Sequence, residues 1–380
     1  MMAVSDIIAI FAGQHFKTLT AINHRMSQIL VFNNEVAAAV EAIVDEAKPN
    51  GLFIITDTNV RREVLPSLAE QSPAVARACV IECDPGDEAK NLRTLSEIWS
   101  RLVAGGCSRS SLIINLGGGV VTDMGGFAAA TFKRGVKFIN IPTTLLAAVD
   151  ASVGGKTGIN FEGLKNEIGV FREAVAVIIS TCFFGSLPRE ELLSGYAEML
   201  KHGLLDSEEA VDMLLDFPIE NCDEPKELLQ LLKKSVAVKQ RVVEADPHEH
   251  GLRKALNLGH TMAHAMEGLA LKTGSHLAHG YAVARGLVAD LVLSHMKHGF
   301  PSERLHSVAA FVKSRYGAPE FTCDDYDTLI QLMRHDKKNI DPETINFTLL
   351  AAPGDIRLDS TATPQEITAA LDITRDLLGC

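Results

Sequence analysis

The stretch that decides the fold of the first half is SLIINLGGGVVTDMGGFAA, residues 111–129. An apolar strand runs into three consecutive glycines and then into a helical pattern. Glycines let a diphosphate approach the backbone, and the amides at the start of a helix supply positive potential. Gly118 and Gly119 are therefore candidate cofactor contacts. The pattern is not GxGxxG, so a tight structural turn stays as the alternative, and Asp123 has a rival role as a helix cap.

Outward from this stretch, the first half of the chain alternates strand and helix. The strand patterns are near-continuously apolar and rich in Val and Ile, which is typical of a parallel sheet covered on both faces. A ligand is then expected beyond the carboxyl ends of the strands. The remaining strand patterns lie at 28–34, 51–59, 78–83, 137–144 and 174–180, with helical patterns at 35–47, 88–103 and 122–132.

After residue 187 the pattern becomes helical, with Pro, Gly and Asp between the segments. We therefore predict an α/β plus all-α protein. A Rossmann-like domain with a parallel sheet spans 1–187, and a mainly α-helical metal- and substrate-binding domain spans 188–380. The helical patterns lie at 189–204, 207–216, 226–245, 254–270, 278–299, 302–315 and 324–335, and a strand pair is expected at 344–359.

Composition excludes several classes of protein. The 380 residues carry a net charge of −12, whereas nucleic-acid binding demands a basic excess. Seven cysteines, an odd number without a CxxC pair, indicate a reducing compartment. The first residues lack the basic start of a signal peptide, and no apolar run approaches the roughly 18 residues of a membrane span. We expect a cytoplasmic protein that binds neither nucleic acid nor membrane.

Polar residues follow two predicted strands. Asp57 and Asn59 end one of them, and Asp87 and Lys90 follow the next. Such residues suit ribose and phosphate contacts, although each alone is more often a turn residue.

A third polar group lies in FKRGVKFINIPTTLLAAVDASVGGKTGINFEGLKNEIG, residues 132–169. Two lysines close to glycine turns in an acidic protein indicate an anion site, and the segment is too apolar for an ordinary surface linker. Its candidate residues are Arg134, Thr143, Thr144, Asp150, Lys156, Lys165 and Asn166.

A possible metal site lies in RKALNLGHTMAHAMEG, residues 253–268. His260 and His264 stand four apart and so share a helix face, as metal ligands do. The Glu of an HExxH protease is absent, and a lone His pair is at least as often a core or surface feature. A third donor is required, for which His279 and Glu198 are candidates. Three protein ligands would describe a catalytic metal.

The order of these motifs resembles the 3-dehydroquinate synthase family. The resemblance covers roughly residues 50 to 340 and includes IPTTLLAAVDASVGGKTGIN, LKNEIG, LPREELLSGYAEMLKHG, GLRKALNLGHTMAHAMEG and RHDKKN. It implies an N-terminal NAD-binding domain, a divalent metal (zinc or cobalt) and a homodimer. It further implies conversion of 3-deoxy-D-arabino-heptulosonate 7-phosphate, a phosphorylated sugar acid, into 3-dehydroquinate and phosphate, a step of the shikimate pathway.

The resemblance also implies roles for individual residues. Glu198, His260 and His279 would hold the metal, and His264 would face the substrate phosphate. Lys239 and Arg253 would pair with the substrate carboxylate, and Arg134 would reach a neighbouring subunit. The remaining substrate residues would be Asp150, Lys156, Lys165, Asn166, Lys201, Asn257 and one of Lys337 and Lys338. NAD would contact Asp57, Asn59, Asp87, Lys90, Gly118, Gly119, Asp123, Thr143, Thr144, Lys156, Lys165, Phe183 and Ser186.

The chain departs from the common family pattern at Tyr281, Glu167 and the pair Ala148 and Ala151. Glu167 matters most, because a carboxylate beside a phosphate site would repel the phosphate. Three alternatives stay open: a related cyclase acting on another sugar phosphate, a polyol dehydrogenase, and a ligand-sensing protein without turnover. Lys239 and Arg253 favour a substrate that carries a carboxylate.

Overall fold

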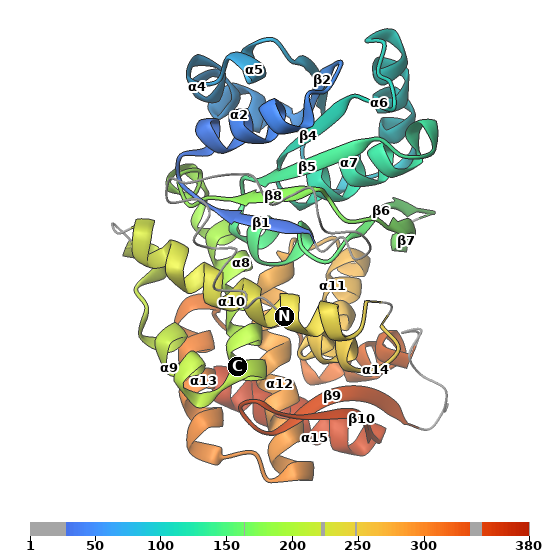
Figure 1. Cartoon of the computed structure of the whole chain (residues 1–380). Coiled ribbons are helices and arrows are strands. Elements are labelled where there is room, and N and C mark those ends of the chain that lie inside the picture. Colours follow the sequence, from blue (N-terminus) through green and yellow to red (C-terminus); the bar gives the residue numbers. More distant parts are fainter. Residues whose placement is uncertain (1–27, 163, 222–224, 248, 335–343, 380) are drawn as a thin grey trace.

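The computed structural model describes residues 28–162, 164–221, 225–247, 249–334 and 344–379. Lys337 and Lys338 therefore lie outside the described residues. Figure 1 shows a sheet flanked by helices at one end of the molecule and a helical body at the other. The α/β plus all-α prediction is confirmed.

A six-stranded parallel sheet forms the first half. Its order is β1-β8-β5-β4-β2-β3, and each neighbouring pair is parallel. From β2 the chain moves to β3 on one side and then to β4 on the other, so a topological switch point lies between β2 and β4. The strands are β1 (Ile29–Phe32), β2 (Leu52–Asp57), β3 (Cys79–Cys83), β4 (Leu112–Gly117), β5 (Lys137–Pro142) and β8 (Ala176–Ile179).

Helices cover both faces of this sheet because successive side chains of each strand point to opposite faces. In β2, Ile54 packs with the helices on one face, whereas Phe53 and Ile55 pack with those on the other. The first face carries α2 (Val36–Ala47), α3 (Thr58–Glu63), α4 (Leu65–Gln71) and α5 (Pro73–Ala76), and the second carries α6 (Leu92–Ala104) and α7 (Gly119–Thr131).

The segment between β5 and β8 contains structure that the sequence did not predict. After the π-helical turn η5 (Ala147–Ala151), the antiparallel strands β6 (Lys156–Phe161) and β7 (Leu164–Phe171) form a separate hairpin. Every residue of β7 is exposed. Exposure on both faces removes the alternation of polar and apolar residues that identifies a strand in sequence.

The second half is helical, as predicted, with one pair of antiparallel strands. The expectation of one helix over 254–270 is wrong: Gly259 has a φ of 80° and separates the turn η8 (Leu252–Asn257) from α11. The elements are α8 (Arg189–Asp206), α9 (Glu208–Asp216), α10 (Pro225–Ala245), α11 (His260–Thr273), α12 (His279–His298), α13 (Ser302–Tyr316), α14 (Tyr326–Arg334), β9 (Ile345–Ala352), β10 (Asp355–Ala362) and α15 (Pro364–Leu378).

The two halves share a core. Buried residues of the α6 and α7 face and of the helical body form one continuous cluster, and α8 packs against η5. The domain boundary at 187/188 falls just before α8 and stays a prediction. No helix in the described ranges is long and apolar enough to cross a membrane.

Candidate functional site

The predicted NAD residues gather at the carboxyl edge of the sheet. Asp57 ends β2 and caps α3, because its side chain accepts hydrogen bonds from the amides of Asn59 (2.9 Å) and Val60 (3.0 Å). Asp57 therefore has a structural role in the turn that follows β2. At the end of β4, Gly118 caps α7, and a Cβ there would lie 3.2 Å from Thr144 Cγ2. These residues lie at the ends of β2 and β4, the two strands on either side of the switch point, where a ligand is expected in such a sheet.

The other predicted NAD residues follow β3, β5 and β8. Asp87 lies in the turn η3 (Asp87–Ala89) after β3, and Thr143 and Thr144 follow β5. After β8, the hydroxyl of Ser186 donates to the Phe183 carbonyl (3.2 Å) in the turn η6 (Phe184–Ser186).

A buried lysine joins this edge to the hairpin. The ammonium of Lys90 donates to Asp123 on α7 (2.6 Å) and to the side-chain oxygen of Asn166 on β7. Asp123 does not cap α7, because the capping position is Gly118. Burial raises the pKa of Asp123, and Lys90 opposes the rise. Lys90 therefore connects a predicted cofactor residue with a predicted substrate residue.

Glu198, His260 and His279 meet in one cluster from three helices. Their ligand atoms all lie within 4.8 Å of one another. Glu198 Oε1 is 3.3 Å from His260 Nε2 and 3.4 Å from His279 Nε2. His260 and His279 are the first residues of α11 and α12, so both imidazoles stand at helix N-termini facing α8. The structure thus brings together all three predicted ligands.

The far nitrogen of each imidazole also has a partner. His260 Nδ1 lies 3.1 Å from the Leu258 carbonyl, and His279 Nδ1 lies 3.5 Å from Glu267 Oε1. Such contacts fix the tautomer and leave Nε2 free to bind an ion. Burial alone would lower the pKa of His279, but Glu198 and Glu267 raise it to about 10. An ion that binds at Nε2 must therefore displace a proton from this imidazole.

The donor set fits a divalent ion. Neither buried carboxylate oxygen of Glu198 has a hydrogen bond of acceptable geometry among the described residues. Burial opposes ionisation of Glu198, but Lys201 and His260 outweigh it and hold its pKa well below the usual range. One carboxylate and two imidazoles are typical ligands of a catalytic zinc.

Asp150, Glu198 and His202 form a second group with suitable donor atoms. Both groups share Glu198 and its contact with Lys201, but in the second group Asp150 is also paired with the buried ammonium of Lys239. A dication in the second group would have to displace Lys239 as well. We therefore assign the ion to the first group.

The predicted carboxylate-binding pair comes from two elements, because Lys239 lies on α10 and Arg253 lies in η8. Lys239 donates to the backbone carbonyl of Asp150 (2.6 Å), and Arg253 donates to the carbonyls of Gly154 (3.0 Å) and Pro247 (2.6 Å). Both cations are buried, and Arg253 Nε has no hydrogen-bond partner among the described residues. Burial lowers the pKa of each. The two cations therefore contact neighbouring main-chain groups, at Asp150 in η5 and at Gly154 just after it.

Two carboxylates that the sequence analysis missed lie in the site. Glu249 binds Lys156 Nζ (2.6 Å) and accepts from Asn257 Nδ2 (3.4 Å). Glu267 lies 3.3 Å from Lys165 Nζ. Glu249 lies in an irregular turn, where spacing carries no signal. Glu267 follows His260 by seven residues, two helical turns, and this spacing could have been noticed.

Other residues that the sequence analysis singled out are not among the three candidate metal ligands. His264 is exposed one turn along α11, with its ring centroid 5.6 Å from that of His260. Arg134 is exposed beyond α7, as a residue that reaches a neighbouring subunit must be.

Tyr281 packs against Tyr316, with ring centroids 5.1 Å apart. Glu167 neighbours Asn166 on β7 and is exposed. The ring contact with Tyr316 explains how an aromatic residue is tolerated at position 281.

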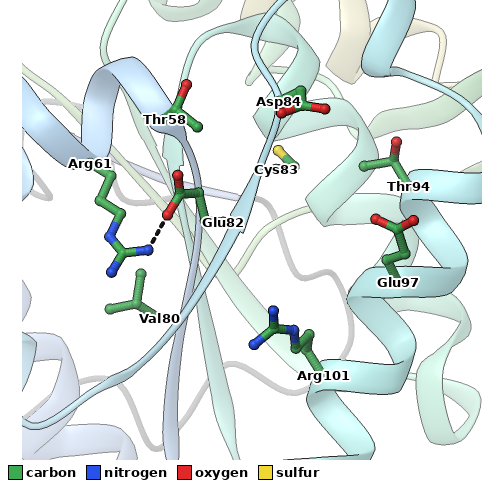
Figure 2. Close-up of a pocket in the computed structure, with 9 residues that line it drawn as sticks. All are labelled: Thr58, Arg61, Val80, Glu82, Cys83, Asp84, Thr94, Glu97 and Arg101. Carbon is green, nitrogen blue, oxygen red and sulfur yellow. Dashed lines mark hydrogen bonds and ion pairs between the residues drawn. The ribbon is translucent and has the colours of Figure 1, made fainter.

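A polar cavity of about 260 Å³ lies along the edge strand β3, between α3 and α6 (Figure 2). Arg61 and Glu82 pair across it, and Arg101 points into it from α6. None of the predicted site residues lines it.

The fold joins a parallel sheet with a polar carboxyl edge to helices that carry a carboxylate–imidazole cluster. This arrangement defines a class of two-part α/β enzymes with a candidate metal site at the junction. Models of the N-terminal and C-terminal parts of 3-dehydroquinate synthase match residues 80–194 and 195–339. The chain belongs to the 3-dehydroquinate synthase family.

Individual relatives agree with this assignment. The chain is 47% identical to a 3-dehydroquinate synthase of Parabacteroides distasonis, over 93% of this chain and 99% of that one. It is 40% identical to that of Pyrococcus furiosus, over 78% and 85% respectively.

Solved structures show the same fold. A 2-epi-5-epi-valiolone synthase from Streptomyces hygroscopicus with bound NAD⁺ and Zn²⁺ is 25% identical, with a TM-score of 0.80, over 94% of this chain and 99% of that one. A 2-deoxy-scyllo-inosose synthase with carbaglucose-6-phosphate, NAD⁺ and Co²⁺ is 24% identical, with a TM-score of 0.79, over 91% and 96%.

Proposed function

We propose that this chain is a 3-dehydroquinate synthase, which converts 3-deoxy-D-arabino-heptulosonate 7-phosphate into 3-dehydroquinate and phosphate. The observation that carries the proposal is the Glu198–His260–His279 cluster beside the buried cations Lys201, Lys239 and Arg253. In an acidic protein, three buried cations next to a candidate metal site indicate a binding site for an anion. The carboxylate and phosphate of a sugar acid phosphate provide such anionic groups.

Each group has a task in this reaction. NAD bound at the carboxyl edge supplies reversible hydride acceptance, and a divalent ion on the cluster supplies Lewis-acid polarisation of a substrate oxygen. Lys239 and Arg253 hold the substrate carboxylate. Lys156 and Asn257 hold the phosphate, which replaces Glu249 as their partner. His264, exposed beside His260, exchanges a proton with the departing phosphate through water.

A panel of acid and neutral sugar phosphates tests this proposal. With NAD and zinc or cobalt, the heptulosonate phosphate should release one equivalent of phosphate and give a cyclised product without net NADH. Accumulating NADH would indicate an ordinary dehydrogenase. Turnover of only neutral sugar phosphates would indicate a cyclase of the inosose or valiolone type. Binding without turnover would indicate a ligand-sensing protein.

We also propose that the protein is a homodimer that buries the β6–β7 hairpin. Five large apolar side chains of the hairpin are exposed by 37% to 59%, namely Phe161, Leu164, Ile168, Val170 and Phe171. Such a patch on a surface is typical of a binding interface. The hairpin also carries Lys156 and Asn166, so an interface there would bring a second subunit to the site.

Sedimentation velocity tests the interface. We expect the wild type to sediment as a dimer and the double variant Leu164→Glu, Ile168→Glu as a monomer. Leu271→Glu, at an exposed apolar residue on α11, should leave the dimer intact. A monomeric wild type, or a dimer that survives the hairpin substitutions, would contradict the proposal.

We place the protein in the cytoplasm. The five cysteines among the described residues are all free, as expected for a reducing compartment. The substrate is small, and we assign no nucleic-acid or membrane partner.

A further inference from the structure

We propose that Asn160 is a positioning residue that ties the cofactor turn at Asp87–Lys90 to the substrate strand β7, so that NAD and the substrate phosphate bind cooperatively. The inference rests on the proposed function, because it takes Asp87 and Lys90 as NAD residues and Asn166 as a substrate residue. Asn160 itself belongs to neither set.

Asn160 makes three hydrogen bonds across the two segments. Its side-chain oxygen accepts from the amide of Asn166 (3.0 Å), and its side-chain amide donates to the carbonyl of Asp87 (3.3 Å). Its backbone amide donates to the carbonyl of Lys90 (2.8 Å). Asn160 lies near the end of β6, where the ladder with β7 shifts register between Ile159 and Phe161. The irregularity turns this residue towards the cofactor turn.

The position of Asn166 depends on this contact. Asn166 has a φ of 56°, in the left-handed region, which costs free energy for a residue other than glycine. The bond from its amide to Asn160 stabilises this conformation. In the same conformation its side-chain oxygen accepts from Lys90, which also holds Asp123. Asn160 therefore fixes the substrate strand and the cofactor lysine relative to each other.

Two further contacts join β7 to the turn: Lys90 donates to the side chain of Asn166, and Lys165 forms a weaker ion pair with Asp87. Lys165 Nζ lies 3.6 Å from Asp87 Oδ2, and their side chains are 47% and 51% exposed. Exposed ion pairs at this distance contribute little, because water and salt screen them. Asn160 instead uses directed hydrogen bonds to main-chain groups, which hold geometry.

Cooperativity follows from shared ordering. A ligand that orders one segment also orders the other through Asn160, so the second ligand loses less conformational entropy when it binds. By linkage, the factor by which phosphate tightens NAD binding equals the factor by which NAD tightens phosphate binding.

The test measures NAD affinity by titration calorimetry with the zinc-loaded protein, without and with saturating inorganic phosphate. For the wild type we expect phosphate to tighten NAD binding. Asn160→Ala removes the two side-chain hydrogen bonds and leaves the Lys90–Asn166 contact. For this variant we expect NAD binding about five- to tenfold weaker, as for loss of a hydrogen bond, and a smaller tightening by phosphate than in the wild type. The conservative variant Asn160→Asp keeps the acceptor for Asn166 and loses the donor to Asp87, so part of the wild-type response should return.

The control is Asn50→Ala. Asn50 also donates and accepts through its side chain, at Ser108 and Ser111, but it lies at the amino end of β2. Thermal unfolding of each variant is recorded in parallel. If Asn160→Ala keeps the wild-type response to phosphate, or changes it no more than Asn50→Ala does, the inference is wrong while the proposed function stands. If the wild type binds no NAD, the proposed function fails first.

Discussion

At the residue scale, the site depends on a few buried ionisable groups whose neighbours set their charge. Glu198 is buried yet ionised because Lys201 and His260 face it. Burial alone would raise the pKa of Asp150, but the ammonium of Lys239 outweighs burial and lowers the pKa below its usual range. This carboxylate is therefore also held ionised. A buried charge without such partners is costly. The buried carboxylates and the cations that face them therefore depend on each other for their charged states.

The two histidines of α11 should separate metal binding from turnover. His260→Ala removes an imidazole that faces Glu198, so we expect it to lose the metal on dialysis. His264→Ala should keep the metal and lose turnover by about 10²- to 10⁴-fold, as for a lost acid–base group. Metal content by mass spectrometry and steady-state kinetics check both. Equal metal loss in the two variants would refute the ligand assignment.

His202 should make the fold sensitive to acid. Its Nδ1 contacts the Ser235 hydroxyl (3.0 Å), and burial, with help from Lys201, lowers its pKa to about 3. An unfolded histidine titrates near 6.5, so between about pH 6.5 and pH 3 the unfolded chain binds more protons than the folded one. This histidine therefore costs stability progressively as the pH falls through that window.

Urea unfolding of the wild type and His202→Asn across this pH range measures the effect. The stability of the wild type should fall relative to the variant by at most about 1.4 kcal/mol per pH unit. His306→Asn, at an exposed histidine, serves as the control. Parallel curves for the wild type and His202→Asn would show that His202 is not held neutral.

At the element scale, the ends of helices and one turn present the site. The α11 and α12 helices begin with metal-type ligands, and Gly259 permits the sharp entry into α11 through its positive φ. The turn after α10 is held by Asp246, which accepts from the amides of His250 (3.0 Å), Gly251 (2.6 Å) and Arg253 (3.1 Å). It thereby places Arg253.

Asp246→Asn should loosen this turn in a pH-dependent way. The Gly251 amide is the main cause that lowers the pKa of Asp246 to about 2. A depressed carboxylate pKa gives stability that is present above the unfolded value of about 4 and lost as the pH falls to about 2. The stability difference between wild type and variant, measured by urea unfolding, should therefore shrink over that window. Asp376→Asn, at an exposed aspartate of α15, serves as the control. A pH-independent difference for Asp246→Asn would contradict this role.

At the scale of the whole molecule, the site forms where a sheet edge, a hairpin and a helical body meet (Figure 1). The predicted NAD residues follow the strands of the sheet, the predicted metal ligands come from α8, α11 and α12, and the hairpin contacts α11 through Lys165 and Glu267. One continuous core holds the sheet and the helical body together. In the proposed dimer, Arg134 of one subunit would complete the site of the other.

Subunit mixing should reveal a shared site. If Arg134 acts across the interface, Arg134→Ala and His264→Ala homodimers are each impaired, but a mixed dimer contains one site with both residues intact. Mixing the two variants by denaturation and refolding should restore about a quarter of the wild-type activity. Activity no higher than the mean of the two variants would place Arg134 within its own subunit's site.

The sequence by itself determined the strand–helix order, the six parallel strands and the long helices. Periodicity and apolar runs report burial directly, and the motif order gave the family and the candidate residues. These signals are local, so they survive without coordinates.

Only the tertiary structure decided which of these residues meet. Contacts between distant segments, such as Glu249 with Lys156 or Glu267 with His279, depend on how elements pack and leave no periodic signal. The hairpin escaped detection because its exposed strand has no buried face, and the break before α11 depends on a backbone angle at Gly259. Burial and positive φ are set by neighbours in space, and therefore the fold was needed to see them.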